Sequence, residues 1–216
     1  VAVINIVTKE AGERDSLTGT LEIGENSTRR VNMTYGKKFG KFSFWIDATH
    51  RGSDGWNMSD DYEPVTGTLR LRPRGWSDVV FEDGGVRNNS DYEINTIWTK
   101  LGYNRAPGSE YFVNLHYVDS DRGVPPDVNG EMIFTSRPAF SGLFRYGRYD
   151  DWGVDLSGRE KLTDSLSLSG KLFYHDHVDD YVSYDDVEYT NQIALSTYKD
   201  YMAGINLYMD YRVSDA

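Results

Sequence analysis

The chain has 216 residues, a formal net charge of −11 and no cysteine. The missing cysteines exclude disulfide scaffolds, thiol catalysis and cysteine-ligated zinc, and the acidic balance argues against a nucleic-acid partner, which would need a basic face. No run of eighteen apolar residues occurs, so no transmembrane helix is expected. Sixteen tyrosines and five tryptophans favour a membrane β-barrel, where such rings gather at the headgroups, over the alternative of an aromatic-rich soluble β protein.

The first predicted element is a strand over residues 2–9, with the sequence Ala-Val-Ile-Asn-Ile-Val-Thr-Lys. Its four β-branched apolar residues, interrupted by one asparagine, suit a pleated and packed surface. On physical grounds alone the octet indicates only a buried strand.

Period-two alternation predicts about eight further strands, because such a pattern gives a strand one apolar and one polar face. Helical periodicity is absent from the sequence, so the expected fold class is all-β. The alternating segments are residues 17–23, 31–35, 42–49, 97–103, 111–117, 152–156, 165–174 and 203–211.

After the first connection, short turns alternate with long loops. The short turns are predicted at residues 36–40, 104–109 and 158–164. The long loops are predicted at residues 52–92, 119–137 and 175–190. Within the first long loop, residues 66–71 and 78–81 are compatible with a separate hairpin.

Loops sorted by length in this way are typical of outer-membrane barrels. The sequence therefore predicts the antiparallel meander of a transmembrane outer-membrane β-barrel, with about eight strands present. The same alternation, with the apolar face directed inward, would suit a soluble barrel with a dry interior. A soluble barrel therefore stays as an alternative.

The opening octet resembles the Gly-Val-Ile-Asn-Ile-Val-Thr-Lys segment that ends the plug domain of TonB-dependent outer-membrane receptors, with Ala2 in place of the usual Gly. Arg29-Arg30 with Tyr35-Gly36, and the run from Tyr149 to Gly153, also resemble barrel strands of that family. The resemblance implies that residues 1–12 are the last strand of a plug-like domain with its linker, and that residues 13–216 are barrel strands. Because the family has a sizeable plug and about twenty-two strands, it also implies a fragment.

Several functional expectations follow from the resemblance. It implies a receptor in the outer membrane of a Gram-negative bacterium that takes up a scarce ligand such as a ferric siderophore, another iron chelate or cobalamin. Its implied partners are outer-membrane lipid, lipopolysaccharide, a plug domain and a TonB-type energy-coupling protein, although no energy-coupling box is visible in the sequence. The alternatives are a self-standing small outer-membrane barrel with a structural or adhesive role, and a soluble ligand-binding β-barrel.

Few residues in the sequence indicate ligand binding, metal binding or catalysis. Trp56, Trp76 and Tyr92 are candidate ligand contacts in the loops, with loop packing or headgroup anchoring as the alternative. His175 and His177 form the one cluster with metal-ligand character, since they would share a face if a strand continued that far; the alternative is a solvated loop rim. No nucleophile elbow, HExxH helix or phosphate-binding glycine loop appears, so neither enzymatic activity nor a cofactor is predicted.

Overall fold

The computed structural model describes residues 11–12, 15–64, 66–71, 75–80, 82–126 and 143–213. These residues form ten strands and no helix, so none of them could cross a membrane as a helix. The strands are β1 (Ser16–Ile23), β2 (Arg29–Phe39), β3 (Phe42–Ser53), β4 (Thr66–Leu71), β5 (Gly75–Val80), β6 (Tyr92–Ala106), β7 (Ser109–Val124), β8 (Leu143–Lys161), β9 (Leu166–Tyr184) and β10 (Gln192–Tyr211).

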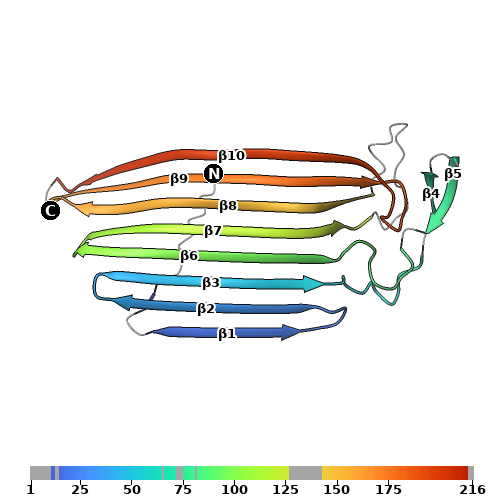
Figure 1. The fold of residues 1–216 in the computed structure, drawn as a ribbon, viewed down its shortest axis with the longest axis horizontal. Helices are drawn as coiled ribbons and strands as arrows, with labels where there is room; N and C mark the ends of the chain where they lie inside the picture. Colours follow the sequence, from blue (N-terminus) through green and yellow to red (C-terminus); the bar gives the residue numbers. More distant parts are fainter. Residues whose placement is uncertain are drawn as a thin grey trace.

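Eight of the strands form one antiparallel sheet in the order β1-β2-β3-β6-β7-β8-β9-β10, in which each strand pairs with its neighbour in the chain apart from the β4–β5 excursion (Figure 1). The predicted all-β meander of about eight strands is therefore confirmed. Strands β4 and β5 form a separate hairpin within the first long loop, with β4 at the predicted residues and β5 at residues 75–80 in place of 78–81. The sheet is open within the described residues, with β1 and β10 as its edges.

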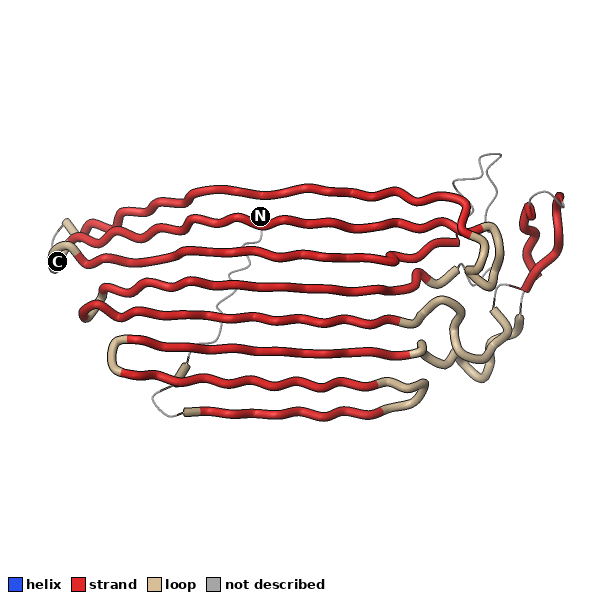
Figure 2. The backbone as a smooth tube through the Cα atoms, viewed as in Figure 1, coloured by secondary structure: helices blue, strands red, loops and turns tan. Residues whose placement is uncertain are grey.

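Connections of different length lie at opposite ends of the sheet, as Figure 2 shows. At one end, called the turn end, β2 reaches β3 through Gly40 and Lys41, and β6 reaches β7 through Pro107 and Gly108. Gly40 and Gly108 have φ angles of 63° and 81°, which a residue without Cβ adopts at little cost. The opposite end, called the loop end, carries the long excursion between β3 and β6.

Five predicted connections are clearly shorter than expected, because strands continue into them. Strands β6, β7 and β8 take residues from the predicted connections at 104–109, 119–137 and 158–164. The other two cases lie in β2 and β9. Residues 36–39 belong to β2, which leaves a two-residue turn, and β9 continues through Tyr184 where an acidic loop was expected from His175. In both places polar or small residues interrupt the apolar alternation, but the backbone still pairs with a neighbouring strand. The histidines of the candidate metal site therefore lie on a strand. The opening octet, residues 2–9, lies outside the described residues.

The described residues enclose almost no hydrophobic core. Only Ala11, Leu143 and Val182 are buried hydrophobic residues among them, whereas many leucines, tyrosines and tryptophans are exposed. A water-soluble domain of this size normally buries a contiguous apolar core. The apolar residues of this sheet instead lie together on one of its faces, and that arrangement defines the candidate functional site.

Candidate functional site

Strand register gathers the predicted apolar positions of all eight strands on a single face. One row of directly paired residues crosses the whole sheet on this face, and all but one of its members are apolar. The row is Leu17, Tyr35, Ile46, Thr99, Leu115, Val154, Tyr174 and Ala203. Because residues two apart share a face, the apolar residues above and below this row extend it into a continuous apolar belt.

The apolar belt runs obliquely across the strands. On β1 it covers residues 17–23, entirely on the loop side of the common row, whereas on β10 it covers residues 201–211, mostly on the turn side of Ala203. Its centre therefore shifts by about six residues of about 3.3 Å over seven strand spacings of about 4.8 Å. The belt crosses the strands at about 30° from the perpendicular, close to the roughly 35–45° tilt of strands in closed barrels.

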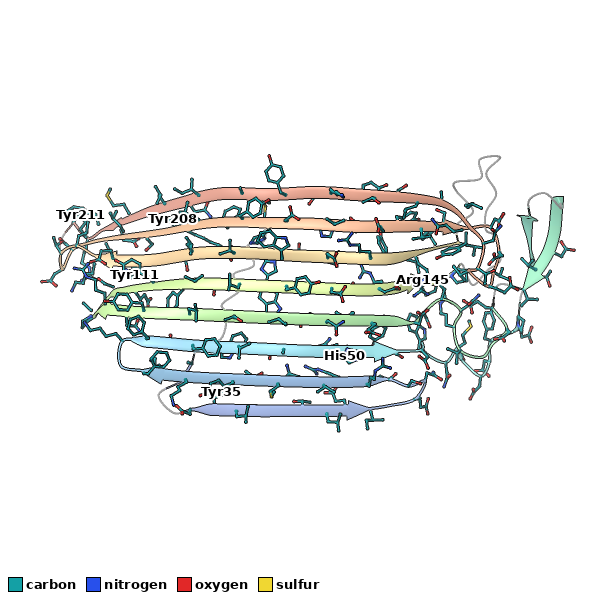
Figure 3. All side chains as sticks on the ribbon, viewed as in Figure 1. Tyr35, His50, Tyr111, Arg145, Tyr208 and Tyr211 are labelled. Atoms are coloured by element: carbon teal, nitrogen blue, oxygen red, sulfur yellow. The ribbon has the colours of Figure 1, made fainter. Side chains whose placement is uncertain are left out.

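Aromatic rings line both edges of the apolar belt. At the turn end Phe39, Phe42, Tyr103 and Tyr111 stack in series, with ring centroids 6.2, 5.0 and 6.4 Å apart. Figure 3 shows Tyr111 at this end of the sheet, with Arg145 toward the opposite end.

At the loop edge, the ring of Trp152 lies 5.5 Å from that of Tyr174, which stacks on Tyr201 at 6.2 Å. Two aromatic rows flanking an apolar band are the arrangement found at the two interfaces of membrane barrels.

The opposite, polar face is a network of paired side chains. Asp47 accepts hydrogen bonds from Asn32, at 2.8 Å, and from Thr34. Asp155 accepts a hydrogen bond from Lys171 Nζ at 2.9 Å and lies 3.0 Å from His175 Nε2. These polar groups lie within hydrogen-bond distance of one another across neighbouring strands, which offsets the cost of crowding them on one face.

Glycines let aromatic rings lie close against this polar face. A Cβ at Gly153 would lie 2.4 Å from His116 Cε1 and 2.5 Å from His175 Cδ2, so only glycine leaves room for the two rings. Their centroids are 4.8 Å apart in an edge-to-face arrangement. Likewise, a Cβ at Gly204 would lie 2.5 Å from the ring of Phe173.

His175 and His177 both lie on the polar face, as the prediction required, but they bind separate carboxylates. His175 Nε2 lies 3.0 Å from Asp155, and His177 Nε2 lies 3.0 Å from Asp179. No group of three His, Cys, Asp or Glu side chains in the described part of the chain is arranged to hold a metal ion. Metal binding by these two histidines stays a prediction.

The three aromatic ligand contacts expected in the loops are not gathered at one place. Tyr92 begins β6 and lines a polar hollow of about 380 Å³ at the loop end, whereas Trp56 does not line that hollow. Trp56 is 51% exposed, and its backbone N–H donates to Ser90 Oγ at 3.2 Å. Trp76 lies on β5, and its side chain is outside the described residues. Ligand contact by the three residues stays a prediction.

Ion pairs around Arg145 hold the loop end together, and no sequence pattern predicts them. The Arg145 guanidinium donates to both carboxylate oxygens of Asp91, at 2.9 and 2.7 Å, and to Asp121 at 2.7 Å. It also donates to the Asn89 side chain at 2.9 Å. These partners are 24 to 56 residues away in the chain, so no local pattern could have indicated the cluster.

Among the described residues of the long excursion, Glu82 is the most buried charged one. Its side chain is nearly fully buried, accepts the Asn88 backbone N–H at 2.9 Å and lies 3.7 Å from Arg87. Burial raises the pKa of this carboxyl above its usual value, because the charged form loses its hydration.

Comparison with models of known protein families and with curated proteins finds no match for this chain. The two faces of the sheet are therefore the features from which a function can be inferred.

Proposed function

We propose that this chain forms part of the wall of a transmembrane outer-membrane β-barrel, with its apolar face toward lipid and its polar face toward the barrel interior. One observation carries the proposal: the described residues bury only three hydrophobic residues, while their apolar side chains form one exposed belt. Exposed apolar surface of this extent is unfavourable in water and favourable against hydrocarbon. The oblique course of the belt and its two aromatic edges support the same reading.

The exposure of the two faces argues against a soluble barrel with an apolar interior. Leu115 and Leu172 on the apolar face are 43% and 50% exposed, whereas the side chains of His116 and Asp155 on the polar face are 9% and 17% exposed. Side chains crowd together on the concave face of a curved sheet. The polar face is the more crowded one at these positions, which supports a barrel with that face inside.

The edges of the sheet support a barrel with more than eight strands. In Figure 1 the strands lie side by side as a broad sheet, with β1 and β10 at opposite edges. Strand β1 has 8 residues and β10 has 20, which makes them poor partners for closing a small barrel. Unpaired edges are strongly disfavoured in lipid, so we propose that further strands pair with both.

We further propose that the barrel is that of a TonB-dependent receptor. This step depends on the resemblance of residues 2–9 to the end of the plug domain, with the barrel-like sheet as additional support. The receptor would take up a scarce ligand such as a ferric siderophore or cobalamin, and would work with a plug domain and a TonB-type energy-coupling protein in the outer membrane of a Gram-negative bacterium.

The length of the native polypeptide tests this proposal. We would separate the source membranes, capture the protein with an antibody to this segment and measure its intact mass. A mass several times 24.6 kDa in the outer-membrane fraction is expected for the receptor. A mass near 24.6 kDa would contradict the receptor and favour a self-standing small barrel. Recovery from the soluble fraction would contradict the membrane assignment altogether.

A further inference from the structure

The apolar belt contains a hollow near the turn end. It has a volume of about 720 Å³, within the roughly 300–1,000 Å³ typical of small-molecule sites. Its side walls are apolar, and it reaches from the aromatic row at Phe42 and Tyr111 to Leu207 on the edge strand β10. The part of the belt that we place against lipid is therefore not a uniform convex surface.

Two glycines form the floor of the hollow. Gly158 on β8 and Gly170 on β9 are directly paired, and register places both on the apolar face. Tyr111 lies beside Gly158 and Leu207 beside Gly170, because a Cβ at either glycine would lie 2.6 Å or 3.0 Å from those side chains. The ring and the leucine therefore lean over the two glycines, and they form the walls of the hollow above this floor.

The rim of the hollow at the turn end is charged. Glu160, two residues beyond Gly158 on the same face, lines the hollow and accepts hydrogen bonds from Tyr111 Oη and Arg105. The Arg105 side chain stays 59% exposed, so its guanidinium has free donor capacity at the surface. Lys41 Nζ donates to the Arg105 carbonyl at 2.9 Å and brings a second cation to this rim.

We propose that the hollow binds one glycerophospholipid, with an acyl chain along the Gly158–Gly170 floor and the phosphate at Arg105. An apolar hollow that ends at an exposed guanidinium matches a molecule that joins a hydrocarbon chain to an anionic phosphate. This inference rests on the proposed function, because it requires the apolar face to meet lipid. In barrels of that kind the short turns lie on the periplasmic side, so the bound lipid belongs to the inner leaflet.

The test uses the full-length polypeptide purified in dodecyl maltoside and titrated with dioleoylphosphatidylglycerol, with bound lipid counted by native mass spectrometry. Dioleoylglycerol, which has the same chains and no phosphate, is the control lipid. Wild-type protein is expected to retain one molecule of phosphatidylglycerol. Its occupancy by the diacylglycerol is expected to be about tenfold lower, because the charge-assisted hydrogen bonds to the phosphate are lost.

Two variants test the two parts of the site. Gly170→Leu fills the hollow and Arg105→Gln removes the cation, and each is expected to lower phosphatidylglycerol occupancy about tenfold, equivalent to loss of one good contact. Gly19→Leu, on the same face with no atom within 4 Å of its Cβ, and Arg148→Gln, at the loop end, are the matched controls and retain the lipid. If Gly170→Leu fails to fold, Arg105→Gln and the two lipids still decide the question.

Flotation with phosphatidylglycerol vesicles separates this inference from the proposed function. If the protein floats with the vesicles but all variants and both lipids are retained equally, the lipid site is wrong and the membrane wall stands. If the wild-type protein does not associate with the vesicles, the proposed function fails and the lipid site fails with it.

Discussion

The imidazole Nε2 of His116 on β7 lies 2.7 Å from the carboxylate of Asp151 on β8, on the polar face of the sheet. The His116 side chain is almost fully covered, so this contact is shielded from water on a sheet whose apolar side chains are exposed. The relationship inverts the usual arrangement of a soluble protein, in which polar groups face solvent and apolar groups are buried.

Removing the acceptor of this contact tests how far the polar face stabilises the sheet. Asp151→Ala leaves His116 without its carboxylate partner and is expected to lower the free energy of unfolding by about 1–3 kcal/mol. Denaturant titration of the protein in detergent micelles measures the change. Asp60→Ala, at an exposed loop position, is the control with little expected effect. Equal stability of both variants would show that the pair contributes nothing.

Gly153 is required because two rings occupy the place of its side chain. Gly153→Val puts atoms where His116 and His175 now lie, and the forced displacement is expected to cost about 1–3 kcal/mol. Gly19→Val makes the same chemical change on β1 in open space and is expected to be tolerated. Thermal unfolding of the two variants compares them directly, and a larger loss at Gly19 would contradict the packing described for Gly153.

A lysine in the apolar belt tests which face meets lipid. Leu115→Lys lies in the row common to all eight strands and is expected to lower the stability of the protein in bilayers by about 2–4 kcal/mol. Thr96→Lys, on the neighbouring strand β6 and on the polar face, is the control with a smaller effect. Folding into phosphatidylcholine vesicles measures both, and the reverse order would place lipid against the polar face.

Burial of Glu82 makes the stability of the long excursion depend on pH. Because its folded pKa is raised above the usual value of 4.5, the folded state holds its proton more tightly than the unfolded state does. The local stability is therefore greatest below about pH 4.5 and falls as the pH rises through the folded pKa. Hydrogen exchange of the Asn88 amide, corrected for intrinsic rates, is expected to show this fall, and Glu82→Gln is expected to abolish it. An unchanged slope in the variant would assign the effect to another group.

The sequence was informative where the apolar belt crosses a strand. The period-two pattern is clear in these places, since one side of each strand is uniformly apolar. It is seen from Leu17 to Ile23, around Leu115 and in the last strand up to Tyr211. Beyond the belt both faces of a strand are polar, and the pattern disappears. For this reason the sequence predicts a loop from His175, although the backbone up to Tyr184 pairs with β8 on one side and β10 on the other.

The polar contacts could not be predicted in the same way. The faces of single strands follow from local alternation, but the pairing of Arg145 with Asp91 and Asp121 depends on how distant strands come into register. Glycines are a second source of error. The sequence predicts Gly36 as a turn residue, yet it lies within β2, where the ring of Trp45 occupies the space beside it. Glycine serves turns and close ring packing equally well, and only the paired strand distinguishes them.

Spin labelling of β7 tests most directly whether the apolar face of the sheet meets lipid. These 216 residues contain no cysteine, so single cysteines can be placed at residues 111–117 of the full-length polypeptide once any cysteine outside this segment has been replaced. In vesicles, collision rates with oxygen, which is concentrated in lipid, are expected to be high at Val113 and Leu115 and low at Asn114 and His116. A period-two pattern of the opposite phase, or access of a water-soluble nickel reagent to Leu115, would contradict the account.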